Sequence, residues 1–299
     1  MFRCFSDFKC FLTYLFPFPQ KSSLVKHRVK NIREREKKNS SLGLSRQCLL
    51  SSLALVLELS VSRSEKNANK GIMPHYTLYY FDVRSRGEVI RLLFHLADEK
   101  FEDKRFLMEE WGALKSQMPL GQVPVLEVDG VKIAQTTAIL RYLGHQFRMC
   151  LGLIMTNKKE YQTSDRAGTN AVDCARLDMM AEVIQEFMSA EGMGSFSRVL
   201  FGLIQANKDQ FFKEKVLPDV EKYAPLVEKF LLENGNNGLL LGDRETWVDV
   251  FAAETFKKII DFGSPDALDA YPHILALINR VFNHPNIKKY VSQRKATPA

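Results

Sequence analysis

The sequence predicts a small α/β domain followed by an all-helical domain. Two observations predict the first domain: strand-like segments alternate with a helical segment in the order β-α-β, and an Asp-Gly turn joins two later strands that precede another helix. A third observation predicts the second domain, because apolar residues beyond residue 167 recur with a helical period. The chain has 299 residues, of which 45% are hydrophobic, so it can build two domains around a buried core.

The elements of the first domain, residues 73–147, follow one another from residue 76. Residues 76–81 are β-branched and aromatic, which predicts a strand, and residues 86–98 have helical spacing. Further strands are predicted at 101–106, 123–128 and 131–133, and a further helix at 136–147. A βαβ unit followed by a ββα unit is the thioredoxin-like plan, so we expect a thioredoxin-like fold here.

The second domain, residues 167–299, is predicted to be helical throughout. Helical periods are present at 177–187, 220–230 and 274–281, and a short last helix is expected at 286–291. Residues 248–262 are apolar nearly all round, which predicts a buried central helix. Thr246 and Asp249 have the spacing of a capping box, so we interpret Asp249 as structural and not catalytic.

The net charge of +7 belongs to the N-terminal quarter of the chain. Residues 1–72 contain 14 Lys and Arg against 5 Asp and Glu, a net +9, whereas residues 73–299 contain 28 against 30, a net −2. This distribution argues against nucleic-acid binding by the body of the protein. We expect residues 1–72 to form a disordered basic extension, with a mitochondrial presequence as the alternative, and residues 148–166 to form an irregular insertion.

Cysteine spacing excludes several kinds of site. None of the five cysteines forms a C-x-x-C pair, and no Cys/His spacing suits zinc, so no metal is expected. The place where a thioredoxin carries its cysteine pair holds Tyr80-Phe81-Asp82-Val83, which excludes thiol–disulfide exchange by a protein cysteine. No apolar run reaches the roughly 18 residues of a membrane span, so no membrane partner is expected.

Four segments of the first domain carry a combination of motifs. They are residues 73–81, the run Arg84-x-Arg86-x-Glu88-x-Ile90-Arg91, residues 121–130 and residues 135–143. Together they resemble the sigma class of glutathione S-transferases, nematode members most of all, and the resemblance covers about residues 73–147 and 167–292. It implies a cytoplasmic homodimer that uses glutathione as co-substrate and conjugates the glutathione thiolate to electrophilic apolar small molecules, in detoxification.

The resemblance implies two catalytic residues. A free thiol has a pKa near 8.5 and is mostly protonated at pH 7, so the enzyme must favour the thiolate. In the family a tyrosine at the end of the first strand donates a hydrogen bond to the glutathione sulfur, and Tyr80 matches it. Tyr79 and Tyr76 are the alternatives, although Tyr76 is expected to pack in the sheet. Arg86 is the second candidate. The equally weighted alternative is that Arg86 is only a solvated arginine at the start of the helix.

The resemblance also implies which residues bind glutathione. Val123 and Pro124 match the family's cis-proline, whose backbone pairs with the cysteinyl part of glutathione. Gln135 and Thr136 match the helix N-terminus that binds the γ-glutamyl carboxylate, and Thr136 could cap the helix, either alone or in addition to this role. The remaining candidates are Trp111, Lys115 and Gln122 for the glycine carboxylate, and Glu186 or its neighbour Glu182 for the amino group across the dimer. Trp111 could equally be a packing residue.

The pocket for the electrophile is expected beside Tyr80. Its expected lining is Phe81, Val83, Arg84, Met188 and Met193. Two other functions fit the same resemblance. One is glutathione-dependent isomerisation of prostaglandin H to prostaglandin D, but the relative that performs it has a tryptophan near the position of Met193. The other is a non-catalytic glutathione-binding or crystallin-like structural protein, against which the matching thiol and carboxylate sites argue.

Overall fold

The structure is a computed structural model that describes residues 74–147, 149 and 171–297. The predicted extension at 1–72 lies outside the described residues, and so does the predicted insertion at 148–166 apart from Met149. Met149 is buried, and its backbone N–H donates to the carbonyl oxygen of Gly144 at 2.8 Å. Its own carbonyl oxygen accepts from the N–H of Trp247 at 3.2 Å, which ties the end of the first domain to the second.

A four-stranded sheet forms the centre of the first domain. Its strands are β1 (Tyr76–Phe81), β2 (Glu102–Phe106), β3 (Val125–Val128) and β4 (Val131–Ala134), in the order β2-β1-β3-β4. β1 and β2 are parallel, which requires a crossover helix, whereas β3 is antiparallel to both of its neighbours. This arrangement confirms the predicted thioredoxin-like fold.

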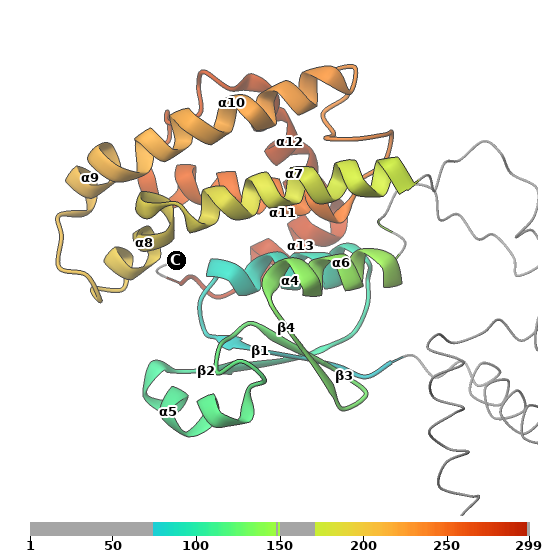
Figure 1. The fold of residues 1–299 in the computed structure, drawn as a ribbon, viewed down its shortest axis with the longest axis vertical. Helices are drawn as coiled ribbons and strands as arrows, with labels where there is room; N and C mark the ends of the chain where they lie inside the picture. Colours follow the sequence, from blue (N-terminus) through green and yellow to red (C-terminus); the bar gives the residue numbers. More distant parts are fainter. Residues whose placement is uncertain (1–73, 148, 150–170, 298–299) are drawn as a thin grey trace, which may run out of the picture. The chain divides into compact units, whose positions relative to one another are not determined.

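Helices cover both faces of the sheet (Figure 1). The crossover helix α4 (Ser85–Leu96) and helix α6 (Thr136–Gln146) lie on the face toward the second domain. The connection from β2 to β3 lies on the other face and consists of short turns of helix: η1 (Met108–Glu110), α5 (Trp111–Leu114) and η2 (Lys115–Gln117). The sequence gives no periodic signal for such short pieces, and their bounds were not predicted.

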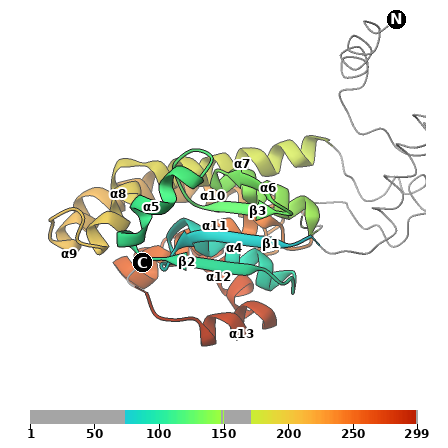
Figure 2. The same cartoon turned by 90° about the horizontal axis from the view of Figure 1, so that it is seen from below.

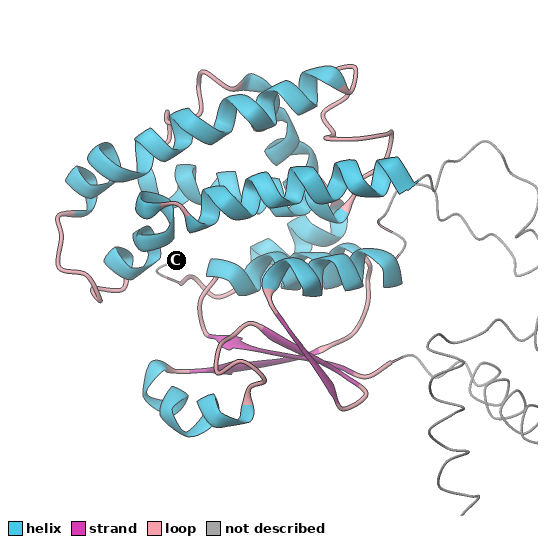
Figure 3. Cartoon of the chain, in the orientation of Figure 1, coloured by secondary structure: helices cyan, strands magenta, loops and turns pink. Residues whose placement is uncertain are grey.

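The regular elements described in the second domain are all helices, joined by loops (Figure 3). Its helices are α7 (Ala171–Ser189), α8 (Glu191–Leu200), α9 (Lys208–Phe211), η3 (Phe212–Val216), α10 (Leu217–Glu233), α11 (Trp247–Lys258), η4 (Ile259–Gly263), α12 (Pro272–Asn283) and α13 (Pro285–Gln293). Helix α13 lies beside α12, on the side of the molecule away from α7 (Figure 2). Among the described helices none is long and apolar enough to cross a membrane.

Helix α11 is the buried centre of the second domain, as predicted. The predicted capping box is confirmed: the Thr246 hydroxyl accepts from the Asp249 N–H, and the Asp249 carboxylate accepts from the Thr246 N–H at 2.7 Å. Asp249 also accepts from the N–H of Leu240 at 2.8 Å. Burial raises the pKa of Asp249 to about 6 in spite of these donors. Asp249 therefore fixes the start of the helix and the loop before it.

Candidate active site

Tyr80 lies at the end of β1, just before the turn into α4. Its side chain is buried, and its hydroxyl oxygen accepts a hydrogen bond from the backbone N–H of Arg86 at 3.1 Å. This N–H belongs to the first turn of α4, where free donors and the helix dipole favour negative charge. Because the oxygen already accepts from Arg86, the single hydroxyl hydrogen of Tyr80 can be donated to another group.

Gly87 allows the ring of Tyr80 to lie against the first turn of α4. A Cβ on Gly87 would stand 2.3 Å from Cδ1 of Tyr80 and 2.7 Å from its Cγ, which is far closer than carbon atoms approach in proteins. The Arg91 guanidinium lies 5.8 Å from the centre of the same ring. The backbone of α4 and the side chains around it therefore fix the position of the tyrosine.

The other two tyrosines of β1 are engaged elsewhere. The Tyr76 ring is buried and packs against Phe94, with 5.2 Å between the ring centres. The Tyr79 hydroxyl donates to Glu127 on the adjacent strand at 3.2 Å. Burial and the Glu127 carboxylate raise the pKa of Tyr79 above its ordinary value. Of the three alternatives considered from the sequence, Tyr80 is the tyrosine that lines the cavity described below.

The peptide bond between Val123 and Pro124 is cis, as predicted from the motif. Pro124 is buried, whereas Val123 is half-buried and Gln122 is exposed. These residues lie immediately beyond the last pair of the β1–β3 ladder, Tyr79 with Val125. The backbone of Val123 is therefore at the same end of the sheet as Tyr80.

Gln135 follows the last residue of β4 and has an unusual backbone conformation, with φ 74° and ψ 122°. It occupies the N-cap position of α6, so it is Gln135 and not Thr136 that precedes the first helical residue. Thr136 is buried as the first residue of the helix, and the Gln135 side chain is exposed. The Gln135 side chain makes no capping hydrogen bond, so it does not occupy the donors of this helix start.

The remaining glutathione candidates differ in their surroundings. The Trp111 ring is half-buried and stacks on Phe106, with ring centres 5.8 Å apart, so it has a packing role in this aromatic cluster. Lys115 is exposed at the start of η2. Glu186 is exposed on α7, whereas its alternative Glu182 forms an ion pair with Arg141 at 3.5 Å. The contacts of Lys115 and Glu186 with other described residues therefore do not show which ligand these two residues bind.

A cavity of about 550 Å³ opens beside Tyr80, with walls from both domains. Four of the expected pocket residues line it, namely Phe81, Val83, Met188 and Met193, and so does Arg86. These largely apolar residues line one space together with Tyr80, the combination expected of a small-molecule site. Within the described residues, no group of three or more His, Cys, Asp or Glu side chains is placed to hold a metal ion.

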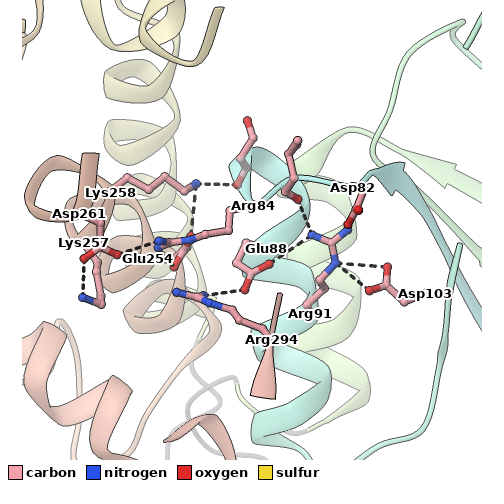
Figure 4. Close-up of polar contacts among 12 residues, drawn as sticks. Asp82, Arg84, Glu88, Arg91, Asp103, Glu254, Lys257, Lys258, Asp261 and Arg294 are labelled. Atoms are coloured by element: carbon pink, nitrogen blue, oxygen red, sulfur yellow. Dashed lines mark hydrogen bonds and ion pairs between the residues drawn. The ribbon is translucent and has the colours of Figure 1, made fainter. Parts of the chain in front are cut away.

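Arg84 is not among the described residues that line the cavity, which corrects the expectation from the sequence. Its buried guanidinium forms ion pairs with two carboxylates of the second domain, Glu254 at 3.1 Å and Asp261 at 2.7 Å (Figure 4). Burial lowers the pKa of Arg84, but the two carboxylates more than offset this and hold it above its ordinary value. Arg84 joins the two domains and is not available to a ligand.

Lys258 lines the cavity and was missed in the sequence, as was Ser85. The Lys258 ammonium donates to the carbonyl oxygen of Ser85 at 2.6 Å and lies 3.7 Å from Glu254. The sequence did contain a signal for Lys258. Glu254 and Lys258 are four residues apart on a helix predicted to be buried, where an acid and a base need partners. The prediction of a helix that is apolar nearly all round overlooked this pair.

Comparison with known protein families identifies the family to which this chain belongs. A family model described as the N-terminal domain of glutathione S-transferase matches residues 76–145, and the corresponding C-terminal model matches residues 193–294. The chain is 80% identical over 227 residues to probable glutathione S-transferase gst-36 of Caenorhabditis elegans, across 76% of this chain and 100% of that protein. The chain belongs to the glutathione S-transferase family. It is therefore a glutathione transferase, and its co-substrate is glutathione.

Solved structures place this transferase among similar folds. NaGST-2 aligns with a TM-score of 0.66 and 34% identity, over 76% of this chain and 100% of that one. The monomeric Na-GST-3 of Necator americanus aligns with a TM-score of 0.64 and 32% identity, over 75% and 98%. Prostaglandin synthase D of Nilaparvata lugens aligns with a TM-score of 0.60 and 32% identity, over 75% and 100%. The fold is thus shared by proteins named as glutathione S-transferases, one of them monomeric, and by one named as a prostaglandin synthase.

Proposed function

We propose that Tyr80 stabilises the glutathione thiolate in this transferase and that Arg86 supports the same charge. The observation that carries the proposal is the hydrogen bond from the Arg86 N–H to the Tyr80 oxygen at the wall of the cavity. This bond leaves the hydroxyl hydrogen to be donated to sulfur, and a hydrogen bond to the charged form lowers the pKa of a thiol. The half-buried Arg86 side chain lines the same space, where a cation favours an anionic sulfur.

We propose that glutathione lies along the end of the sheet next to Tyr80. The Val123 backbone, held by cis Pro124, would pair with the cysteinyl part, and the start of α6 at Gln135 and Thr136 would bind the γ-glutamyl carboxylate. The glycine carboxylate is assigned to Trp111, Lys115 and Gln122, and the amino group to Glu186 of a second subunit. The exposure of Lys115, Gln122 and Glu186 is compatible with ligand contact.

The electrophile is assigned to the apolar side of the cavity, against Phe81, Val83, Met188 and Met193. With 1-chloro-2,4-dinitrobenzene, the thiol proton passes to water and the thiolate sulfur forms a bond to the ring carbon that carries chlorine. The C–Cl bond then breaks and chloride leaves with the bonding electron pair. The protein contributes orientation and stabilisation of the thiolate.

We further propose that the protein is a cytoplasmic sigma-class homodimer that acts in detoxification. The motifs at 73–81 and 121–143 support the class, and the exposure of Glu186 on α7 is compatible with a contribution across a dimer. We assign residues 73–147 to the glutathione-binding domain and residues 167–299 to the helical domain. Because Na-GST-3 is monomeric, the mass of this protein in solution, measured by light scattering, is the test of the dimer.

The role of Tyr80 is tested with the full chain and the variant Tyr80→Phe. We expect kcat/KM for 1-chloro-2,4-dinitrobenzene to fall about 10- to 100-fold, which corresponds to the loss of one hydrogen bond to a charged group. Tyr79→Phe is the matched control, because it removes a hydroxyl from the same strand that bonds to Glu127 outside the cavity. Equal activity of Tyr80→Phe and the unaltered enzyme would contradict the assigned role.

Prostaglandin-H to prostaglandin-D isomerisation is the second candidate activity. It is favoured by the similarity to the prostaglandin synthase D structure, at 32% identity over 75% of this chain. Incubation with prostaglandin H2 and glutathione, followed by product analysis, separates the two activities. Retention on immobilised glutathione without either activity would instead support a non-catalytic binding protein.

A further inference from the structure

The first turn of α4, which begins at Ser85 shortly after β1, determines the surroundings of Tyr80. It contains Ser85, whose φ of 30° is rarely adopted by residues with a side chain, and Arg86, whose N–H donates to the Tyr80 oxygen at 3.1 Å. Such a backbone conformation persists only where neighbouring groups hold it. The groups that stabilise this turn therefore also fix the position of the Tyr80 hydroxyl.

The groups that hold the turn come from the helical domain (Figure 4). Lys258, the last residue of α11, donates its ammonium to the carbonyl oxygen of Ser85 at 2.6 Å. One turn earlier, Glu254 accepts from the Arg84 guanidinium at 3.1–3.3 Å. The Lys258 side chain is only 8% exposed and lines the same cavity as Tyr80. One amine thus supports the turn and places a positive charge in the cavity wall.

Lys258 keeps its charge among several ionisable neighbours. Burial lowers the pKa of Lys258 to about 8, the Glu254 carboxylate opposes this change, and Arg84 adds to it. The other charged groups around Lys258 and the cavity are Arg86 and Glu88 on α4, Lys257 on α11, Asp261 on η4, Glu109 on η1 and Arg198 on α8. At neutral pH Lys258 therefore remains mostly a cation, and it is one of the residues that line the cavity.

We propose that Lys258 is a positioning residue for the transferase reaction, which holds the Ser85 turn beneath Tyr80 and favours the thiolate through its positive charge. This inference rests on the proposed role of Tyr80. The thiolate is favoured in two ways: the fixed turn aims the Arg86 N–H at the tyrosine oxygen, and the ammonium group attracts negative charge in the cavity.

The test is the variant Lys258→Met in the full chain, with the ionisation of bound glutathione followed by the ultraviolet absorbance of its thiolate. We expect the apparent pKa of the bound thiol to rise by about one unit, so that kcat/KM falls about tenfold at about pH 6.5 and approaches the unaltered value above about pH 9. Lys257→Met is the matched control, because this neighbouring lysine pairs with Asp261 at 2.8 Å and is not among the described residues that line the cavity.

An unchanged thiol pKa and pH profile in a folded Lys258→Met variant would overturn the proposal. If that variant does not fold, Lys258→Gln retains a donor toward Ser85 without the charge, and the same unchanged readouts would overturn the proposal there. Tyr80→Phe separates this inference from the function on which it rests. If Tyr80→Phe raises the thiol pKa and Lys258→Met does not, only the role of Lys258 fails; if Tyr80→Phe has no effect, the proposed function fails.

Discussion

The absence of a side chain at Gly87 allows Tyr80 to occupy its position against α4. The variant Gly87→Ala must displace either the tyrosine ring or the helix, because its Cβ would stand 2.3 Å from Cδ1 of the ring. We expect kcat/KM for 1-chloro-2,4-dinitrobenzene to fall at least about tenfold, since a misplacement of about 1 Å at a reacting group can cost about 100-fold.

Gly112→Ala provides the control for this substitution. Gly112 lies in α5, and a Cβ there would meet nothing within 4 Å. We expect this variant to retain the activity and the thermal unfolding temperature of the unaltered enzyme. Similar kinetics for Gly87→Ala and Gly112→Ala would show that the close approach of Gly87 to Tyr80 does not matter for the reaction.

Individual residues were predictable where a motif specifies them. Tyr80 and the cis bond before Pro124 follow from local sequence patterns, because each belongs to a run of adjacent residues. The surroundings of Arg84 were not predictable, because its partner Glu254 lies 170 residues away along the chain. A sequence motif shows that a residue is near a site, but not whether its side chain turns toward the ligand or toward another domain.

At the scale of elements, the N-terminus of α11 depends on a buried carboxylate. Burial raises the pKa of Asp249 from 3.8 to about 6. Because the folded state binds this proton more tightly than the unfolded state, Asp249 contributes stability at low pH that is lost as the pH rises from about 4 through about 6. In Asp249→Asn the group cannot titrate, so its contribution to the pH dependence disappears.

Urea unfolding of Asp249→Asn and the unaltered protein, measured at several pH values, checks this expectation. The stability advantage of the unaltered protein over the variant should decrease by about 2.4 kcal/mol between about pH 4 and pH 7. Asp269→Asn, which changes an exposed aspartate, controls for the loss of a carboxylate elsewhere. Parallel pH profiles for the unaltered protein and Asp249→Asn would contradict the assigned burial.

The strands and longer helices were predictable because hydrophobic periodicity is a local property. The helix expected at 86–98 is present as Ser85–Leu96, and the strand expected at 131–133 as Val131–Ala134. The turns of helix between β2 and β3 were not resolved from the sequence, because pieces of three or four residues carry no period. The polar residues on α11 were overlooked for the opposite reason, since the apolar pattern around them dominates.

At the scale of the whole molecule, ion pairs join the two domains near both ends of the helical domain's sequence, at Glu182 on α7 and at Arg294 beyond α13. Helix α13 packs against α4, and Arg294 beyond it donates to the buried Glu88 at 2.8 Å (Figure 4). Burial raises the pKa of Glu88, but Arg91 and Arg294 outweigh this and hold it below its ordinary value. The arrangement of two domains was predictable, but these contacts were not, because periodicity carries no information about distant partners.

Arg294→Gln leaves Glu88 buried with Arg91 as its remaining partner at 3.2 Å. Breaking a buried ion pair leaves part of a charge uncompensated, so we expect a loss of about 3 kcal/mol in the free energy of unfolding, measured by urea denaturation. Lys295→Gln is the adjacent control, because Lys295 is 73% exposed in its ion pair with Asp82. Such a surface pair contributes at most about 1 kcal/mol. Equal losses in the two variants would count against the buried pair.

The ion pair of Arg294 with Glu88 also has a consequence for the order of synthesis. The two residues are 206 positions apart, so at about 5–20 residues per second the ribosome adds Arg294 roughly 10–40 s after Glu88. During this interval the carboxylate of α4 lacks one of its two arginine partners. The domain that is translated first is therefore completed by a residue that is translated much later, and the two-domain unit cannot reach its full set of contacts before Arg294 has been added.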